Sequence, residues 1–455
     1  MSASENKLSR YRKSAIAVDH RLASEKVNQP TLAMNPTNQP ADPKFIDSRY
    51  AAWRLFIVLL IATMGNSGMY VLSVVMPQIQ SEFGVSRAEA SLPYTLTMIG
   101  FGLGGIFCGR WADRFGIARV IQLGGAGVLI GYAIAGTTSN VYVFGLAHGL
   151  LIGFFGVGSA FVPLIADTSL WWAKRRGIAV AICASGNYLA GTVWPPIIQY
   201  GVEQFGWRDT YIGLGVFTAL IMALLSLKIR QRPPMLLPVG GGMASSGHTS
   251  DQPFGLSPRN AQLALFVAAI GCCVAMSMPQ VHIVSYCTDL GFGAARGAEM
   301  LSLMLGFGIV SRLASGWISD HIGGLKTLLV GSALQCIALV LFLPFDGLTS
   351  LYVISAMFGL FQGGIVPAYA IIIREHFSPK EAGARVGSVI FGTLIGMAFG
   401  GWVSGAIFDL TGRYHTAFIN GIVWNLMNFF IILWMLKRSQ RFFKPKAAST
   451  VPSGY

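Results

Sequence analysis

Long apolar blocks recur along this chain between Leu55 and Leu436, and each is about as long as a bilayer is thick. An α-helix rises 1.5 Å per residue, so roughly 20 apolar residues cross the ~30 Å of hydrocarbon in a membrane. Lipid offers no partner to an unpaired backbone N–H or carbonyl, so blocks of this length must be helical. Twelve such blocks begin near residues 55, 91, 120, 141, 177, 209, 261, 298, 325, 350, 384 and 415. The sequence therefore predicts an all-α membrane protein of twelve transmembrane helices.

The composition agrees with lipid as the solvent. Hydrophobic residues make up 53% of the chain and charged residues only 11%, against about a quarter in soluble proteins. A net charge of +14 could indicate a nucleic-acid-binding protein, which would gather its cations on one surface with aromatic residues between them. Here the cations are spread loop by loop, so we expect membrane lipid, and no nucleic acid, as a partner.

The basic residues lie in alternate connections between the apolar blocks. Cytoplasmic loops of membrane proteins carry an excess of Lys and Arg. Both ends of the chain are basic, as are the connections around residues 110–119, 174–176, 228–232 and 374–385. The other connections hold only Arg87, Arg208, Arg296 and Arg413. This pattern predicts a multi-pass protein of a bacterial inner (plasma) membrane with both termini in the cytoplasm.

An internal repeat divides the chain into two parts. Gly, Asp and Gly of GRWADRFG (residues 109–116) recur 207 positions later in GWISDHIG (residues 316–323). Duplication of six helices predicts two pseudo-symmetric six-helix bundles with a solute site between them near mid-membrane. We expect these bundles over residues 54–230 and 260–437. We also expect a disordered N-terminal tail over 1–53, a linker over 231–259 and a C-terminal tail over 438–455, all cytoplasmic.

The stretch GRWADRFGIAR and its copy GWISDHIGGLK resemble the signature loop of the major facilitator superfamily, and the resemblance extends from Arg54 to Lys437. It implies a secondary transporter that works by alternating access. In that superfamily the loop holds the two halves together in the outward-facing state. The alternative explanation is an ordinary cytoplasmic turn in which Asp caps a helix, because such a turn contains the same residue types. The residues to which the resemblance assigns this gating role are Gly109, Asp113, Arg114, Gly116, Gly316, Asp320 and Gly323.

Three further stretches resemble the monocarboxylate transporter family in its bacterial branch, a relative of the oxalate/formate exchangers. They are WWAKRRGIAVAICASGNYLAG, PQVHIVSYCTDLG and FGIVSRLASG. The resemblance places Arg312 at the family's substrate-binding arginine and favours proton symport. The animal carriers have an aspartate where this chain has Gly308 and a lysine in the region of Val74, and the exchangers' lysine in span eleven is missing too. A single cation suits a single negative charge, so we expect a monocarboxylate in preference to a dicarboxylate.

Arg312 also stands out without the resemblance, because it is a cation well inside an apolar block. A cation at that depth costs about +2.5 to +3.5 kcal/mol on insertion scales, and no Asp or Glu lies deep in any block to pair with it. Its planar guanidinium can hold a carboxylate by two parallel hydrogen bonds. We expect it to bind an anionic substrate; the alternative is a structural role in helix packing or in pairing with a backbone carbonyl.

Other polar side chains within the blocks are candidates for the wall of the solute cavity, although packing between helices is their default explanation. Spacing of four or seven residues puts two of them on one helix face in span one and again in span ten, and two more are adjacent in span five. These candidates are Asn66, Tyr70, Asn187, Tyr188, Gln362 and Tyr369. His148 and His282 are candidates for proton coupling because imidazole titrates near neutral pH, and a hydrogen-bonded structural role is the alternative.

The motifs of membrane-embedded enzymes are missing from the sequence: it contains no HExxH and no paired carboxylates within a block. The cysteines lack metal-type spacing, so we expect no metal, no cofactor and no enzymatic activity. The function that fits best is transport of a small organic anion by alternating access, with or without proton symport, by a protein that works as a monomer. Alternatives are an anion exchanger, an efflux carrier for neutral or anionic compounds, and a membrane sensor or receptor that does not transport.

Overall fold

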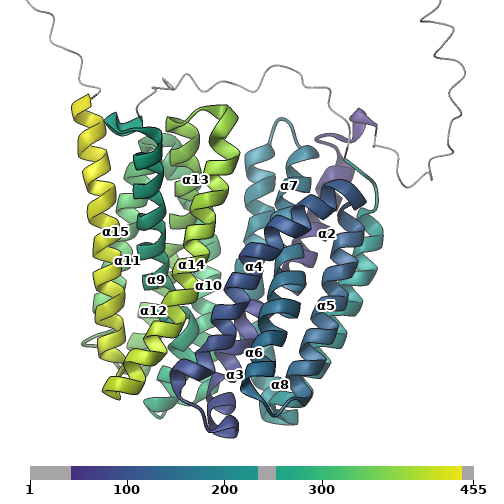
Figure 1. Cartoon of the computed structure of the whole chain (residues 1–455), viewed down its shortest axis with the longest axis vertical. Helices are drawn as coiled ribbons and strands as arrows, with labels where there is room; N and C mark the ends of the chain where they lie inside the picture. The colour runs from purple at the N-terminus through teal and green to yellow at the C-terminus, as the bar shows by residue number, and fades with distance from the viewer. Residues whose placement is uncertain (1–41, 234–252, 443–455) are drawn as a thin grey trace, which may run out of the picture.

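The computed structural model describes residues 42–233 and 253–442, and these residues form a bundle of long helices (Figure 1). The tail expected over residues 1–53 lies mostly outside this part of the chain, as do much of the expected linker and the last 13 residues. Where the structure does describe these segments, the first helix already begins at Arg49 and the last one continues to Phe442.

The helices of the first half begin with η2 (Pro43–Phe45), followed by α2 (Arg49–Gly65) and α3 (Ser67–Phe83), which form one crossing. Then come α4 (Arg87–Phe115), α5 (Ile117–Thr137), α6 (Val141–Leu146), the π-helix η3 (Ala147–Val157), α7 (Val162–Leu170), α8 (Arg176–Ser226) and η4 (Leu227–Ile229). The second half contains η5 (Pro253–Gly255), α9 (Pro258–Asp289), α10 (Ala294–Ile322), α11 (Gly324–Leu341), α12 (Leu348–Gln362), α13 (Ile365–His376), α14 (Pro379–Thr411) and α15 (Tyr414–Phe442).

Within the described residues, 11 helical segments are long and apolar enough to cross a membrane. One of them, Arg176–Ile229, has 54 residues, which at 1.5 Å per residue is far too long for a single crossing of ~30 Å. Gly206 breaks it with φ 79° and ψ 162°, a backbone conformation that residues with a side chain rarely adopt. Two crossings therefore meet at Gly206, and the prediction of an all-α protein with twelve transmembrane helices in two bundles is confirmed.

The two bundles meet chiefly where α4 packs on α14 (Figure 1), α8 on α10 and α3 on α9, and α3 also contacts α10. Glycines allow this approach, as at Gly405, where an added Cβ would lie 2.8 Å from the carbonyl oxygen of Arg87. Elsewhere, helices pack within their own half, α5 on α8 and α9 on α14 for example. The seam between the bundles is thus the one place where side chains of both halves come together.

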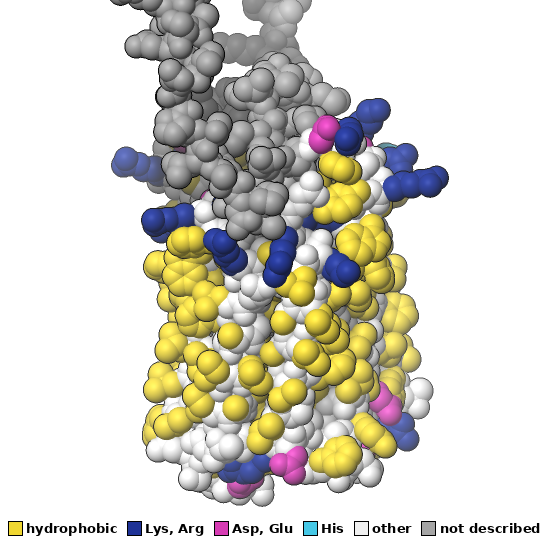
Figure 2. Space-filling view, turned by 90° about the vertical axis from the view of Figure 1, so that its right-hand side faces the viewer, with side chains coloured by type: hydrophobic (Ala, Val, Ile, Leu, Met, Phe, Trp, Pro, Cys, Tyr) yellow, Lys and Arg dark blue, Asp and Glu magenta, His cyan; other side chains and the backbone are white. Residues whose placement is uncertain are grey.

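The two ends of the bundle differ in charge. We call the end that carries Arg49, Arg114, Arg176 and Arg438 the basic face, and the opposite end the distal face. In Figure 2, Lys and Arg ring the basic face, hydrophobic side chains cover the flank, and few charges lie at the distal face. A flank of exposed Phe, Leu, Ile, Val and Trp side chains between two polar ends is the surface that a membrane-spanning bundle presents to lipid.

Arg54 lies inside α2 and only 2% of it is exposed, although the sequence had placed it in the loop before the first span. Its Nη2 donates to Asp167 over 2.8 Å, and its guanidinium lies 4.4 Å from the ring centroid of Trp171. A buried charge needs a partner of opposite sign, and this cation has one. Arg54 and Asp167 are both in the first half near the basic face, so this ion pair joins helices of one bundle.

Candidate functional site

Arg312 lies where α10 meets α8, between the two halves. Its Nη1 donates to the carbonyl oxygen of Ala184 over 2.8 Å, and its Nε is buried without a hydrogen-bond partner in the described chain. Neither Asp nor Glu from the described residues forms an ion pair with it. One corner of the guanidinium is therefore held by the backbone, as the structural alternative requires. The Nε–Nη2 edge, which fits a carboxylate, makes no protein hydrogen bond in these residues.

The ring of Tyr188 covers the guanidinium, with 4.2 Å between the Arg312 Cζ and the ring centroid. Tyr188 can take this position only because residue 308 is glycine. A Cβ added to Gly308 would lie 2.3 Å from the Cε1 atom of Tyr188, closer than real Cβ atoms come to any neighbour. The animal carriers have an aspartate at this sequence position. Here the space beside Gly308 is filled by the ring of Tyr188, which packs against the Arg312 cation.

Tyr70 and Asn187 complete this group from α3 and α8. The Tyr70 hydroxyl donates to Asn187 Oδ1 over 2.9 Å, which leaves the two N–H groups of that amide as free donors in the described structure. A Cβ on Gly191 would lie 2.8 Å from the Tyr70 ring and 2.1 Å from Leu305, so α3, α8 and α10 converge at this glycine. Four of the predicted residues, Arg312, Tyr70, Asn187 and Tyr188, are therefore brought together.

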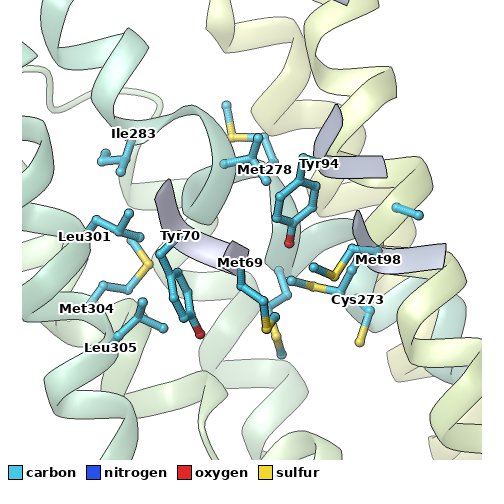
Figure 3. Packing of buried hydrophobic residues seen from close by; sticks show 14 of the residues in the cluster. Met69, Tyr70, Tyr94, Met98, Cys273, Met278, Ile283, Leu301, Met304 and Leu305 are labelled. Atoms are coloured by element: carbon cyan, nitrogen blue, oxygen red, sulfur yellow. The ribbon is translucent and has the colours of Figure 1, made fainter. Parts of the chain in front are cut away.

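The side chains around this group are largely apolar. Figure 3 shows the Tyr70 ring beside Met304 and Leu305, and Tyr94 near Met98 and Cys273. All of these side chains are buried in one cluster that spans both halves. Apolar surroundings strengthen any interaction between a cation and an anion, because little water competes for either. Two hollows on the molecule, one of about 550 Å³ along the end of α15 and one of about 360 Å³ on the α8–α10 flank, are not lined by Arg312.

Three predicted cavity residues lie apart from this group. Asn66 ends α2 and donates to the carbonyl oxygen of Ala62. Gln362 accepts a hydrogen bond from Gln280 within the second half over 3.1 Å, and Tyr369 donates to Asn428 over 2.8 Å, deep between α13 and α15. Each has a hydrogen-bond partner within its own bundle and none bonds to Arg312, although Gln362 Nε2 and Asn66 Oδ1 are buried without a partner in the described residues.

The two histidines have different surroundings, although both are fully buried. His148 lies in the first half, with Nδ1 3.4 Å from the Thr97 hydroxyl and Nε2 3.2 Å from that of Tyr211. His282 lies on α9 close to the seam, with Nδ1 3.1 Å from the Tyr414 hydroxyl and Nε2 2.8 Å from the Gly401 carbonyl oxygen. Only His282 is within two hydrogen bonds of the opposite half.

The repeated loop motif lies at the basic face in both halves. Gly116 (φ 88°, ψ 149°) and Gly323 (φ 83°, ψ 159°) have nearly the same backbone conformation, which only glycine adopts without strain, so the duplication extends to the turn itself. Asp113, Arg114 and Asp320 are exposed, and none of their side chains bonds to the opposite half within the described ranges. A Cβ added at Gly109 or Gly316 would meet nothing within 4 Å.

Hydrogen bonds between the halves lie elsewhere, from Arg312 toward the distal face. In the part of the chain that the structure describes, they join α8 to α10 at Ala184–Arg312 and Thr192–Ser302, and α4 to α14 at Thr95–Ala398. The remainder converge on α4 at its distal end, around Arg87 and Ala88. In the described residues, the hydrogen bonds between the halves therefore extend from Arg312 to the distal face, and none lies at the basic face.

Arg87 is the centre of the distal contacts, and sequence reasoning noted it only as an exception to the charge pattern. Its guanidinium binds both carboxylate oxygens of Asp289, donates to the Tyr414 hydroxyl over 2.9 Å and lies 4.1 Å from the ring centroid of Phe408. The backbone N–H groups of Arg87 and Ala88 donate to Asp409 over 2.9 and 2.8 Å. A lone cation in a connection without any other Lys or Arg was the available signal.

Comparison with known proteins agrees with this architecture. The family model described as "Major Facilitator Superfamily" matches residues 55–350 and 309–452. The chain therefore belongs to the major facilitator superfamily, and it is a membrane transporter and not an enzyme.

Individual relatives are distant. "Monocarboxylate transporter 13" of Bos taurus is 26% identical over 312 residues, which are 68% of this chain and 71% of the relative. The MFS-type transporter YcxA of Bacillus subtilis (strain 168) is 24% identical over 373 residues, 80% of this chain and 90% of the relative. Among solved structures, a bacterial homolog of the human lysosomal transporter Spinster, in an inward-facing and unoccupied conformation, has a TM-score of 0.64. It is 16% identical over 87% of this chain and 98% of its own, so this likeness concerns the fold alone.

Proposed function

We propose that this protein is a secondary active transporter for a small monocarboxylate anion, whose carboxylate binds to Arg312. The observation that carries the proposal is the buried Nε of Arg312, which has no hydrogen-bond partner in the described residues and lies between the two halves. A buried donor without a partner costs about 1–3 kcal/mol, more when it is charged, and an anionic ligand removes that cost. Only a ligand that reaches the seam between the bundles can do so, as alternating access requires.

The neighbouring residues have separate roles in this proposal. The Nη1 bond to Ala184 fixes the guanidinium plane, so the Nε–Nη2 edge is oriented before the substrate arrives. Tyr188 stacks on one side of that plane and keeps water from it. Tyr70 orients Asn187, whose free N–H groups can donate to the substrate. Tyr369, Gln362 and Asn66 each bond within their own bundle, but Gln362 Nε2 and Asn66 Oδ1 have no partner in the described residues and stay candidate contacts of the substrate.

A single negative charge suits this site best. Arg54 is paired with Asp167 and Arg87 with Asp289, so in the described residues Arg312 is the cation at the seam that lacks a carboxylate partner. A second carboxylate on the substrate would enter an apolar cluster without a second cation to meet it. The monocarboxylate transporter among the relatives agrees with this choice.

The basic face is cytoplasmic in this proposal, and the membrane is a bacterial inner membrane. The structure then corresponds to the inward-facing state, because the distal contacts are made and the loop motifs at the basic face are apart. In the outward-facing state Asp113, Arg114 and Asp320 would approach the opposite half while the Arg87 contacts separate. Gly109, Gly116, Gly316 and Gly323 permit that approach because they carry no side chain.

The orientation is tested by reporter fusions. Fusions after Arg119, Arg176 and Arg232 should read as cytoplasmic, and fusions after Gln80, Asn140 and Phe205 as external, because Lys and Arg are concentrated at one face. Enzymatic reporters that are active on only one side of the membrane provide the measurement. Opposite readings at two or more of these positions would refute the proposed topology.

The substrate class is tested with a ligand panel on purified protein. Monocarboxylates such as acetate, lactate, pyruvate and benzoate are compared with dicarboxylates, neutral drugs and organic cations by thermal shift. A ligand at 100 times its Kd stabilises the folded protein by about 2.7 kcal/mol, so a binder should raise Tm measurably. We expect a concentration-dependent rise with at least one monocarboxylate. A rise with neutral compounds and with no monocarboxylate would favour the efflux alternative.

Exchange of one anion for another is the second candidate function, and Gly308 is the observation that favours it. Arg312 has no acid beside it that could exchange a proton as the substrate arrives, so a proton, if it is used, must bind elsewhere. Proteoliposomes distinguish the two modes. Accumulation driven by an inward proton gradient indicates symport, and accumulation that requires vesicles preloaded with anion indicates exchange.

A further inference from the structure

The hydrogen bonds around His282 have a direction that chemistry alone determines. A carbonyl oxygen only accepts, so His282 Nε2, 2.8 Å from Gly401 O, must carry a hydrogen. In the neutral ring Nδ1 is then an acceptor, and the Tyr414 hydroxyl, 3.1 Å away, donates to it. The Tyr414 oxygen in turn accepts from Arg87 Nη1 over 2.9 Å. A one-way chain therefore links Arg87 of the first half to a neutral His282 of the second.

We propose that His282 binds the coupling proton. In this proposal, either Arg87 or the proton on His282 balances the negative charge of one cluster at the distal seam, which contains Asp289 and Asp409. Docking of Arg87 lowers the affinity of His282 for a proton, and separation of the halves raises it. The inference rests on the proposed function, because it names the coupling ion's site in that transporter. It also selects His282 over His148, which has no partner from the opposite half in the described structure.

Charge is the first reason for this competition. With the halves docked, the Arg87 guanidinium pairs with Asp289 of the second half, and the backbone N–H groups of Arg87 and Ala88 donate to Asp409. When the halves separate, Arg87 leaves with α4, and the backbone donors of Arg87 and Ala88 leave Asp409 at the same time. Two carboxylates then remain without a cation, and a proton on His282 replaces the lost charge. When Arg87 returns, it repels the imidazolium, and the proton is released.

Hydrogen bonding is the second reason. A protonated ring donates from both nitrogens, so the Tyr414 oxygen would face donors from His282 and Arg87 at once, and its own hydrogen would have to turn away. The Ser285 hydroxyl lies beside the Tyr414 hydroxyl, one turn along α9 from His282, and is buried with no partner in the described residues. It can accept the redirected hydrogen. The site therefore has a hydrogen-bond arrangement for each protonation state, related by rotation of one hydroxyl.

The other basic side chains near this cluster are exposed. Arg413 and His415, which flank Tyr414 on the chain, form no ion pair in the described residues, and His415 Nε2 lies 3.0 Å from the carbonyl oxygen of Leu343. On α9 the Tyr286 ring packs edge-on against Tyr414, with 5.5 Å between centroids. On α10, which packs against α9, Arg296 and Glu299 form an ion pair with each other at the surface. His282 itself is fully buried in the docked state, so it can exchange protons with external water only after the seam opens. Proton binding is thus tied to the conformational change.

The test follows the separation of the distal ends of the two halves in protein without substrate. Spin labels at Ser81→Cys on α3 and Leu410→Cys on α14, both exposed positions, report the distance across the seam by electron–electron resonance. The six native cysteines are replaced by alanine. We expect one short distance at pH 7.5 and, at pH 5.5, about a tenfold higher ratio of separated to docked molecules, a typical coupling between two sites. His282→Gln should abolish this pH response.

Glutamine is suitable because it can donate to Gly401 and accept from Tyr414, as the neutral histidine does, but it takes no proton. Arg87→Gln should give separated molecules at both pH values. Arg208→Gln is the matched control, since Arg208 is a distal cation that pairs with Glu82 in its own half, and its pH response should equal that of the parent. A pH response retained in His282→Gln, or a docked seam in Arg87→Gln, would overturn the proposal.

The same variants in proteoliposomes relate this site to transport. Under an inward proton gradient, His282→Gln should lose gradient-driven accumulation, whereas His148→Gln should retain most of it. Equal losses in both variants would contradict the assignment. The spin-label experiment needs no substrate, so it stands or fails separately from the ligand panel. A pH-dependent seam without monocarboxylate binding would refute only the substrate class, and binding without a pH-dependent seam would refute only the coupling site.

Discussion

Arg312→Gln is expected to abolish saturable monocarboxylate binding and uptake while the protein still folds and inserts. Truncating one partner of a buried charge pair costs about 2–5 kcal/mol, which raises Kd by roughly 30-fold or more. The glutamine amide ends two bonds short of the Arg312 Nη1, so both the charge and the bond to Ala184 are lost, and the Tm without ligand measures the structural part separately. Expression level, Tm without ligand and the thermal shift with ligand are the measurements.

Arg312→Lys is the companion variant. It retains the positive charge but presents a point donor in place of the planar fork, so we expect binding intermediate between the parent and the glutamine variant. Near-normal uptake by Arg312→Gln would refute the role of Arg312 in substrate binding. If the glutamine variant fails to insert or loses its Tm, the structural role in joining α10 to α8 would be the correct one.

Gly308→Ala is expected to weaken monocarboxylate binding about tenfold, although residue 308 need not touch the substrate. The added Cβ would lie 2.3 Å from the Tyr188 ring, which must then leave its place against Arg312. Overpacking of this kind costs about 1–3 kcal/mol. Ligand titrations at one pH measure the effect on Kd, and the unliganded Tm reports the packing strain separately.

A control and a double mutant separate the steric effect from other causes. Gly306→Ala is on the same helix, and its added Cβ would make an ordinary contact of 3.5 Å with Thr192, so it should have little effect. In a Tyr188→Ala background the same Gly308→Ala change should cost much less, because the ring is gone. An equal loss in both backgrounds would contradict the proposed coupling between Gly308 and Tyr188.

Gly308 also shows why a motif cannot be transferred between relatives position by position. The sequence showed that the carboxylate of the animal carriers is missing, which argued against the usual proton partner. It could not show that Tyr188, 120 positions earlier, occupies the vacated space, because that depends on how α8 and α10 cross. The missing acid is therefore compensated by a different interaction of the same cation, namely stacking on an aromatic ring.

Several properties of this protein were determined by its sequence alone. The number of crossings, the basic face, the duplication and the isolated cation Arg312 all follow from the length of apolar blocks and the position of charges. These properties are local, since the transfer of a segment or a charge into lipid has nearly the same free energy whatever the segment packs against. For the same reason the sequence predicted two spans, beginning near residues 177 and 209, on either side of the break at Gly206.

Only the tertiary structure decided which polar groups meet. Asn66, Gln362 and Tyr369 share helical spacing with good candidates, yet each is bonded within its own bundle. Arg87 binds Asp289 and Asp409, which are 202 and 322 positions away along the chain. Such contacts depend on the rotation of each helix about its axis and on which end of the seam is closed. Those quantities arise from packing of the whole bundle, so residue spacing within one helix cannot predict them.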